Sequence, residues 1–387
     1  MLSISSLTSL FTTLPTPLIP PTIFLSLLLT LWTWKCLWII ILQDKLLYLS
    51  WLPPLSRSES IDDYKKEFRG VRWTEKEIRS LDGMRLAVVE GRYGLSKEVE
   101  EGNGERNELR RRIKKRIIIC YLQGNGGSTP LRLPLLSQTL KAIEEHARSD
   151  FSTGSRPEAE AEYILVALSY RGYWKSKGRA TQSGIEKDAQ ALLDWVHESY
   201  NEPNTVLRVV LWGHSLGAAV ASSAVVKRFS SSVSTSVTEG TEKGIMEPPI
   251  TGLILEAPIS NIKDMLVSLY PQKWLPYRYL WPFSWNTWDV ASSLEQLAQH
   301  REPLPTQSSS RGHRPIPPIL LMSAESDEVI PEWVADQLED KAKSCGLDIA
   351  RKDVKGAMHI ECPLKVEGRK VLVEFIVGSI SSSPRIK

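Results

Sequence analysis

The sequence predicts an α/β fold with a mostly parallel, doubly wound sheet, preceded by one membrane-spanning helix. Short apolar runs recur along the chain, such as IIICYL at 117–122 and YILVALSY at 163–170. Runs of this kind are typical of strands that are covered on both faces. Helix-like segments separate them, and this alternation implies βαβ units. A single apolar stretch near the N-terminus supplies the helix.

The N-terminal stretch is long and apolar enough to cross a bilayer. An uncharged tail at 1–21 precedes the predicted transmembrane helix at 22–42, in which Lys35 is the only charged residue. About 20 helical residues span roughly 30 Å, the thickness of a bilayer core. One lysine costs about 2.5–3.5 kcal/mol to insert, which the surrounding Leu and Ile residues offset. A cleaved signal peptide and an interfacial helix are the alternatives.

The predicted location is therefore a membrane that the chain crosses once. Lys and Arg are absent before the helix, whereas Lys45 and Arg57 follow it. The positive-inside bias then favours the cytosolic side for the remaining chain, although so small a bias leaves the side open. The endoplasmic reticulum is the membrane that we consider.

Composition narrows the function classes. The chain of 387 residues is 42% apolar and 24% charged, as in ordinary globular proteins. A net charge of +3 gives no argument for nucleic-acid binding. The four scattered cysteines form neither a disulfide framework nor a zinc pattern, so we expect no metal and no cofactor. The sequence does not indicate an oligomeric state.

Beyond the helix, residues 60–387 are predicted to form one domain. Further strands are expected at 84–90, 206–212, 252–256 and 319–322, and an apolar stripe predicts a helix over 184–200. Polar or charged segments interrupt this pattern and are interpreted as loop insertions. The insertions lie near 91–116, 147–161, 229–248 and 301–316, and an aromatic-rich segment spans 262–300.

The strongest catalytic signal is the pentapeptide GHSLG at 213–217. It follows the apolar strand VLRVVLW and precedes a helix-prone segment, which is the strand–turn–helix context of a nucleophile elbow. Glycines on both sides of Ser215 allow the tight turn, which lifts the hydroxyl to the carboxyl edge of the sheet. Ser215 is therefore the predicted nucleophile.

A serine hydroxyl needs a base that accepts its proton, and that base needs an orienting acid. His359 follows the last predicted strand and precedes the apolar C-terminal helix, where the base of this fold belongs. Asp327 follows the strand at 319–322 and is the predicted acid. Glu256 is the alternative acid, whereas Glu325 and Glu328 are interpreted as rim residues.

Two further groups complete the predicted site. Backbone N–H groups of Leu216 and of Asn125, in the loop QGNGG, are expected to form the oxyanion hole. Trp274, Trp281 and Trp285 in the aromatic-rich segment are expected to line an acyl pocket or meet the membrane. A small apolar cluster beneath a loop is the alternative for these aromatics.

These segments together resemble the membrane-anchored α/β-hydrolase-domain serine hydrolases, in the branch of monoacylglycerol and lysophospholipid lipases. The matching stretches are YLQGNGGS, SYRGYWKSKG with GIEKDAQALLDWV, VVLWGHSLGAAVA, LILEAPISNIKDML and ILLMSAESDEVIP. Gln123 stands where that family usually has His, and Ser169 where it has Asp. The resemblance implies an α/β-hydrolase fold and ester hydrolysis on a lipid-like acyl substrate.

Three hypotheses for the function follow. The first is a lipase or esterase acting on monoacylglycerol, lysophospholipid or a related lipid ester. The second is a protein-directed hydrolase of the same fold, either a thioesterase that removes acyl groups from cysteine or a serine peptidase. The third is a non-catalytic scaffold, which the complete Ser–Asp–His order disfavours.

Overall fold

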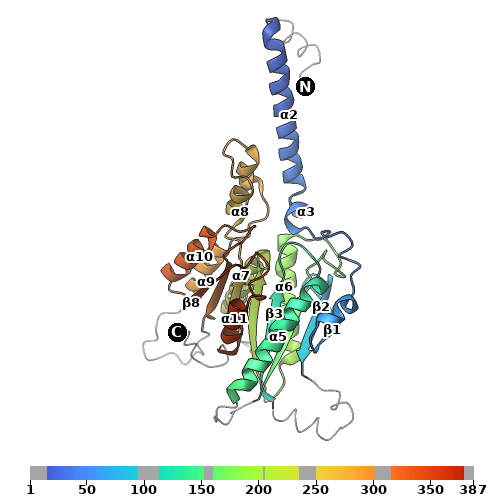
Figure 1. The fold of residues 1–387 in the computed structure, drawn as a ribbon, viewed down its shortest axis with the longest axis vertical. Coiled ribbons are helices and arrows are strands. Elements are labelled where there is room, and N and C mark those ends of the chain that lie inside the picture. Colours follow the sequence, from blue (N-terminus) through green and yellow to red (C-terminus); the bar gives the residue numbers. More distant parts are fainter. Residues whose placement is uncertain are drawn as a thin grey trace.

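An eight-stranded sheet forms the centre of the protein, and helices cover both its faces (Figure 1). The structure, a computed structural model, describes residues 15–94, 113–151, 160–203, 205–234, 250–300 and 315–378. The strand order is β1-β2-β4-β3-β5-β6-β7-β8. The strands are β1 (Val71–Arg79), β2 (Arg85–Tyr93), β3 (Ile113–Leu122), β4 (Glu160–Leu168), β5 (Val206–His214), β6 (Ile250–Glu256), β7 (Ile319–Ala324) and β8 (Ile349–Val354).

The sheet is mostly parallel, as the sequence predicts. β2 pairs antiparallel with both β1 and β4, and all the other neighbouring pairs are parallel. The carboxyl ends of the parallel strands therefore lie at one edge of the sheet, where ligand sites of open α/β sheets are found.

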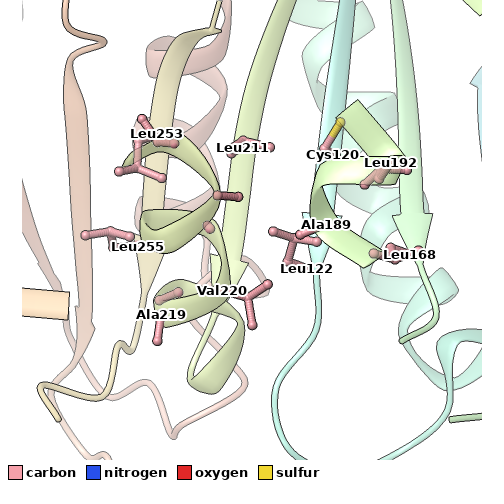
Figure 2. Close-up of a cluster of buried hydrophobic side chains, with 14 of the residues drawn as sticks. Cys120, Leu122, Leu168, Ala189, Leu192, Leu211, Ala219, Val220, Leu253 and Leu255 are labelled. Atoms are coloured by element: carbon pink, nitrogen blue, oxygen red, sulfur yellow. The ribbon is translucent and has the colours of Figure 1, made fainter. Parts of the chain in front are cut away.

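Helices pack on the sheet as two layers, each with its own apolar core. On one face lie α6 (Gln182–Tyr200), α7 (Leu216–Ser234), α9 (Val290–Gln299) and α10 (Trp333–Ser344). Figure 2 shows part of this core, which includes Leu211 of β5, Leu253 of β6 and Val220 of α7. The opposite face carries α5 (Thr129–Phe151) and α11 (Val366–Gly378). Continuous apolar strands are required here because both faces of the sheet are covered.

The predicted strands at 84–90, 117–122, 163–170, 206–212, 252–256 and 319–322 all fall on observed strands. The helix predicted over 184–200 is α6. Most of the residues in the four predicted insertions lie outside the described residues. The aromatic-rich segment at 262–300 is ordered as α8 (Ile262–Leu269), the short 3-10 helices η5 (Pro276–Tyr279) and η6 (Trp281–Phe283), and α9.

The predicted transmembrane helix is a continuous helical segment. A 3-10 turn, η1 (Thr16–Leu18), leads into α2 (Ile19–Ile41), which begins three residues before the predicted start at 22. Residues Thr16–Ile41 are long and apolar enough to cross a membrane, with a mean hydropathy of 1.8. The most apolar part of this segment is not buried against the rest of the protein. Figure 1 shows α2 projecting away from the sheet, with the α8 region beside its base.

The chain between α2 and β1 packs into the domain instead of acting as a free linker. In α3 (Gln43–Tyr48) the side chains of Asp44 and Tyr48 are buried. The Tyr48 hydroxyl donates to Asn286 Oδ1 at 2.5 Å and accepts from Trp288 Nε1 at 3.0 Å. The Asn286 side-chain amide in turn donates to Asp44 Oδ1 at 2.9 Å. The packed body thus includes α3, whereas the sequence places the start of the domain at residue 60.

A second 3-10 segment, η2 (Ile61–Glu67), completes the entry to β1. Ser60 is its N-cap, and the Ser60 and Asp63 side chains form a capping box with the backbone. The η2 segment packs against α5 on the second face of the sheet.

Candidate active site

The GHSLG pentapeptide forms the turn between β5 and α7. Ser215 adopts a φ of +54°, in the left-handed region that residues other than glycine rarely occupy. Its backbone N–H donates to the carbonyl of Glu256 at 2.8 Å, which ties the turn to the end of β6. Ser215 is thus held at the carboxyl edge of the sheet in the conformation that a nucleophile elbow requires.

The two glycines of the pentapeptide are needed because backbone atoms occupy the space of a side chain. A Cβ atom on Gly213 would lie 2.2 Å from the carbonyl oxygen of Gly217. A Cβ atom on Gly217 would lie 2.0 Å from the carbonyl oxygen of Leu122. Both distances are far below a van der Waals contact, so any larger residue would force the elbow away from β3.

The predicted base and acid lie side by side. His359 Nδ1 is 2.9 Å from Asp327 Oδ2 and 3.0 Å from Oδ1. Asp327 Oδ1 also accepts the backbone N–H groups of Val329 and Ile330, each at 2.8 Å. Burial acts to raise the pKa of Asp327, but these hydrogen bonds outweigh it and hold the pKa below its ordinary range. The carboxyl is therefore ionised beside the imidazole.

The histidine loop also lies against the elbow. His214, which precedes Ser215, has its Nε2 3.1 Å from the carbonyl oxygen of His359, and the two rings are 5.0 Å apart. Burial, followed by the charge of Arg132, holds the pKa of His214 well below its ordinary range, so the neutral ring can donate this bond. Among the hydrogen bonds of the described residues, none joins the Ser215 hydroxyl to the His359 ring, and that link stays a prediction.

Glu256, the alternative acid, is placed elsewhere. Its carboxylate accepts the indole N–H of Trp212 at 2.8 Å, and the side chain is buried. Burial raises the pKa of Glu256 to about 8, although the bond from Trp212 and the charge of Arg132 act to lower it. A carboxyl that is protonated at neutral pH and bound to an indole cannot orient His359, so the geometry favours Asp327.

Two carboxylates interpreted as rim residues instead hold the histidine loop. Glu328 accepts the backbone N–H of His359 at 3.0 Å, and Glu325 accepts that of Gly356 at 2.8 Å. Sequence reasoning missed this role. The only signal for it is the closeness of both glutamates to Asp327 along the chain.

The predicted oxyanion loop lies directly against the elbow. A Cβ atom on Gly124 would lie 3.3 Å from Ser215 Cβ, and Leu216 begins α7 immediately after the serine. The Tyr173 hydroxyl lies 2.9 Å from the carbonyl oxygen of Asn125 and is also hydrogen-bonded to the carbonyl of Tyr48. These contacts fix the loop that carries the Asn125 N–H.

The departures from the family pattern are accommodated in part by local hydrogen bonds, although Gln123 Nε2 is buried without a partner among the described residues. The Gln123 amide oxygen accepts from the Thr129 hydroxyl at 3.3 Å, and the Gln123 carbonyl accepts from Tyr170 at 3.0 Å. Ser169 lies on the other side of the loop, where its hydroxyl donates to the carbonyl of Tyr173 at 3.3 Å. Both residues are buried and stabilise backbone beside the oxyanion loop.

An apolar cavity of about 150 Å³ opens beside this loop. Its walls come from the end of α2, from α3, from α8 and from the segment around η6, and Asn125 of the oxyanion loop also lines it. The lining side chains are Ile39, Ile40, Gln43, Leu46, Leu47, Asn125, Ile262, Met265, Leu266, Leu269, Tyr270, Leu280, Phe283, Ser284 and Asn286.

The three predicted pocket tryptophans do not line this cavity. The Trp274 ring lies 6.1 Å from that of Trp32 in α2, and Lys263 lies over the Trp281 ring. The Trp285 indole donates to Asp44 at 3.0 Å. Their contact with substrate stays a prediction, because the structure places Trp274 against α2 and Trp285 against α3. No group of three or more His, Cys, Asp or Glu residues that could hold a metal occurs among the described residues.

The fold and the elbow define a hydrolase of the doubly wound α/β class, and comparison with known families agrees. Residues 148–366, more than half of the chain, match the sequence model of the "Alpha/beta hydrolase family". This protein belongs to that family. The family match covers the elbow and its predicted partners, Asp327 and His359.

Similar proteins include "Lysophosphatidylserine lipase ABHD12" of Danio rerio, which is 29% identical over 46% of this chain and 40% of its own length. "Protein bem46" of Schizosaccharomyces pombe is 24% identical over 56% of this chain and 54% of its own length. Each of these matches spans less than two thirds of the relative. "Alpha/beta hydrolase domain-containing protein WAV2" of Arabidopsis thaliana is 24% identical over 84% of this chain and 83% of its own length.

Solved structures that resemble the protein include an esterase of Pyrococcus furiosus. It is 16% identical, with a TM-score of 0.49 over 81% of this chain and 93% of the other. Carboxyl esterase 2 of Tuber melanosporum is 11% identical, with a TM-score of 0.49 over 81% and 85%.

Proposed function

We propose that this protein is a serine hydrolase that cleaves carboxylic esters of lipid-like substrates through an acyl-enzyme on Ser215. The observation that carries the proposal is the pair formed by His359 and Asp327, at 2.9 Å, beside a serine held at a φ of +54°. The apolar cavity that reaches Asn125 supports an acyl chain as part of the substrate. Monoacylglycerol and lysophospholipid are the substrate classes proposed, and the name of one relative, a lysophosphatidylserine lipase, agrees with the second.

The proposed mechanism assigns one task to each group. Ser215 Oγ attacks the ester carbonyl while His359 Nε2 takes the hydroxyl proton, and ionised Asp327 stabilises the resulting imidazolium. The N–H groups of Leu216 and Asn125 donate to the oxyanion. His359 then protonates the leaving alcohol. A water molecule, deprotonated by the same imidazole, releases the fatty acid and restores Ser215.

Replacing the nucleophile tests this proposal. Ser215→Ala should abolish both labelling by a fluorophosphonate and hydrolysis of a lipid-ester panel, because no other group can form the acyl-enzyme. Ser222→Ala is the matched control, since this buried serine in α7 donates only to the carbonyl of Ala218 at 2.8 Å. Labelling of the Ser215→Ala protein at the wild-type level would refute the assignment.

The same panel separates the alternatives. A protein thioesterase or a serine peptidase of this fold would use the same residues, so only the substrate distinguishes them. The panel therefore includes an S-acylated peptide and an unmodified peptide beside the lipid esters. Faster turnover of the S-acylated peptide than of any lipid ester would favour the thioesterase.

We also infer that α2 anchors the protein as a single-pass membrane protein, with the endoplasmic reticulum and the cytosolic side as the proposed placement. The apolar segment Thr16–Ile41 supports this inference. Carbonate extraction should leave the full-length protein in the membrane pellet, because burying some 20 apolar residues outweighs the cost of Lys35. Release into the soluble fraction would leave peripheral attachment or a cleaved signal. Protease digestion of sealed microsomes then reports the side of the domain.

A further inference from the structure

We call residues 262–288, which begin with α8, the cap. The cap contacts the anchor helix α2 well before the end of that helix. Trp274 meets Trp32, and Lys35 Nζ lies 4.3 Å from the centre of the Tyr277 ring. Trp32 precedes the end of α2 at Ile41 by nine residues, or about 14 Å at 1.5 Å per residue. The tip of the cap therefore lies far above the base of the helix.

The charge pattern of the anchor locates the membrane boundary near the same level. Residues 1–34 carry no charge, and Lys35 is the first charged side chain of the chain. A hydrocarbon core of about 30 Å takes some 20 helical residues, which the uncharged part of the segment supplies. The Tyr277 ring stabilises the Lys35 ammonium at the boundary by a cation–π contact. The cap tip then lies at the boundary of the hydrocarbon.

The surface of the cap suits that position. Its exposed apolar or aromatic side chains include Leu269 at 58%, Trp274 at 67%, Phe283 at 61% and Trp285 at 54%, and the segment also exposes Lys263, Gln272 and Lys273. Burying such side chains in a bilayer is favourable, and tryptophan is typical of the membrane interface. In a purely aqueous setting this patch would be unusual on a soluble domain.

The apolar cavity lies between the cap and the anchor. Ile39 and Ile40 of α2 form one wall, and Met265 and Leu266 of α8 face them across the cavity. Asn125, whose backbone N–H is assigned to the oxyanion hole, also lines the cavity, whereas Ser215 does not. The cavity thus extends along apolar side chains of the anchor and the cap to the oxyanion loop.

We propose that the substrate enters this cavity sideways from the bilayer, with its acyl chain between the anchor helix and a cap that dips into the leaflet. This inference rests on the proposed ester hydrolysis and adds the route and the binding site of the acyl chain. The anchor is then one wall of the substrate site as well as a tether. The lipid ester does not leave the membrane completely before its carbonyl reaches Ser215.

Filling the cavity tests the route. Leu266→Trp blocks it from the cap, and Ile40→Trp blocks it from the anchor. The control is Leu81→Trp, which adds the same side chain at a position 59% exposed in the turn after β1, far from the cavity lining. Two substrates are compared in full-length protein: an oleoyl monoacylglycerol in phosphatidylcholine vesicles and water-soluble 4-nitrophenyl butyrate.

Each cavity-filling variant should lose kcat/KM on the oleoyl ester by a factor at least about tenfold larger than its loss on the butyrate. Leu81→Trp should change neither rate. Equal losses on both substrates in a folded Leu266→Trp or Ile40→Trp protein would overturn the route. The proposed hydrolase would still stand if activity depended on Ser215, so the two failures are distinguishable.

The depth of the cap gives a readout that does not depend on catalysis. A nitroxide is attached at Trp274→Cys, next to Trp32 at the tip of the cap, or, as control, at Val366→Cys, which is 76% exposed at the start of α11. Both are made in a protein with Cys36→Ala and Cys345→Ala. In phosphatidylcholine vesicles the label at 274 should collide more often with oxygen than with a water-soluble nickel chelate, and the label at 366 should show the reverse. Equal collision ratios would place the cap in water and overturn the proposal.

Discussion

Deleting residues 1–55 should destabilise the protein strongly, whereas deleting residues 1–41 should leave the domain folded. The longer deletion removes α3, in which Tyr48 is 1% exposed and Leu47 is 9% exposed. It also removes the carbonyl of Leu52, which accepts the N–H of Gly127 at 2.9 Å beside the oxyanion loop. The shorter deletion removes α2, which has no buried residue.

The cost of the longer deletion follows from these contacts. Losing the burial of Tyr48 and Leu47 costs about 2–3 kcal/mol each. The deletion also leaves two buried donors without their acceptors: Trp288 Nε1 loses Tyr48, and the Asn286 amide loses Asp44. Each unsatisfied donor costs about 1–3 kcal/mol. The sum, about 6–12 kcal/mol, is comparable to the whole unfolding free energy of an ordinary domain.

Thermal unfolding followed by circular dichroism, with hydrolysis of 4-nitrophenyl butyrate, measures both deletions. The protein lacking 1–41 should unfold cooperatively and cleave this soluble ester. The protein lacking 1–55 should lack a cooperative transition at ambient temperature or unfold at a much lower one. Equal unfolding midpoints and equal rates for the two would refute the conclusion that α3 belongs to the folded body.

Two further predictions concern buried and loop carboxylates. Glu256→Gln should raise the unfolding midpoint, and the gain should grow between pH 5 and pH 8. Burial raises the pKa of Glu256 to about 8, so the folded wild type keeps a proton that the unfolded chain releases near pH 4.5. The unfolding free energy of the wild type therefore falls by about 3–5 kcal/mol across that window, whereas a glutamine carries no such proton. A gain independent of pH would contradict this. Glu328→Ala should lower kcat about tenfold, or ~1.4 kcal/mol, by freeing the His359 loop, and Glu328→Gln should restore most of it because an amide oxygen can accept the same N–H. Equal kcat values in the wild type and both variants would show that the contact does not position the base.

Much of the fold is predictable because the buried strands carry their signal locally. The strands β3, β4, β5, β6 and β7 each contain a continuous apolar run. These five runs predict the parallel part of the sheet, and the elbow follows directly from the end of β5. The edge strands β1 and β8 are different. Their sequences, VRWTEKEIR and IARKDV, are rich in charge because an edge strand has solvent on one side, and sequence reasoning did not assign them.

The site divides in the same way. Asp327 and His359 are predictable because the chain order and the strand ends restrict where an acid and a base can lie. The bonds from Glu325 and Glu328 to the histidine loop join side chain to backbone across 31 residues. No sequence pattern predicts contacts at such a separation. The lining of the cavity depends on how α2 lies against α8, which is a tertiary property without a local pattern.

The bond from Tyr173 to the carbonyls of Tyr48 and Asn125 has a consequence for how the enzyme responds to its membrane. Tyr48 is the last residue of α3, which directly continues the anchor, so a change in helix tilt moves one end of this bridge while the catalytic loop holds the other. Helices tilt to match bilayer thickness. If α2 spans the membrane as proposed, we expect turnover to change with the thickness of the surrounding bilayer, a dependence that a detergent micelle would not reproduce.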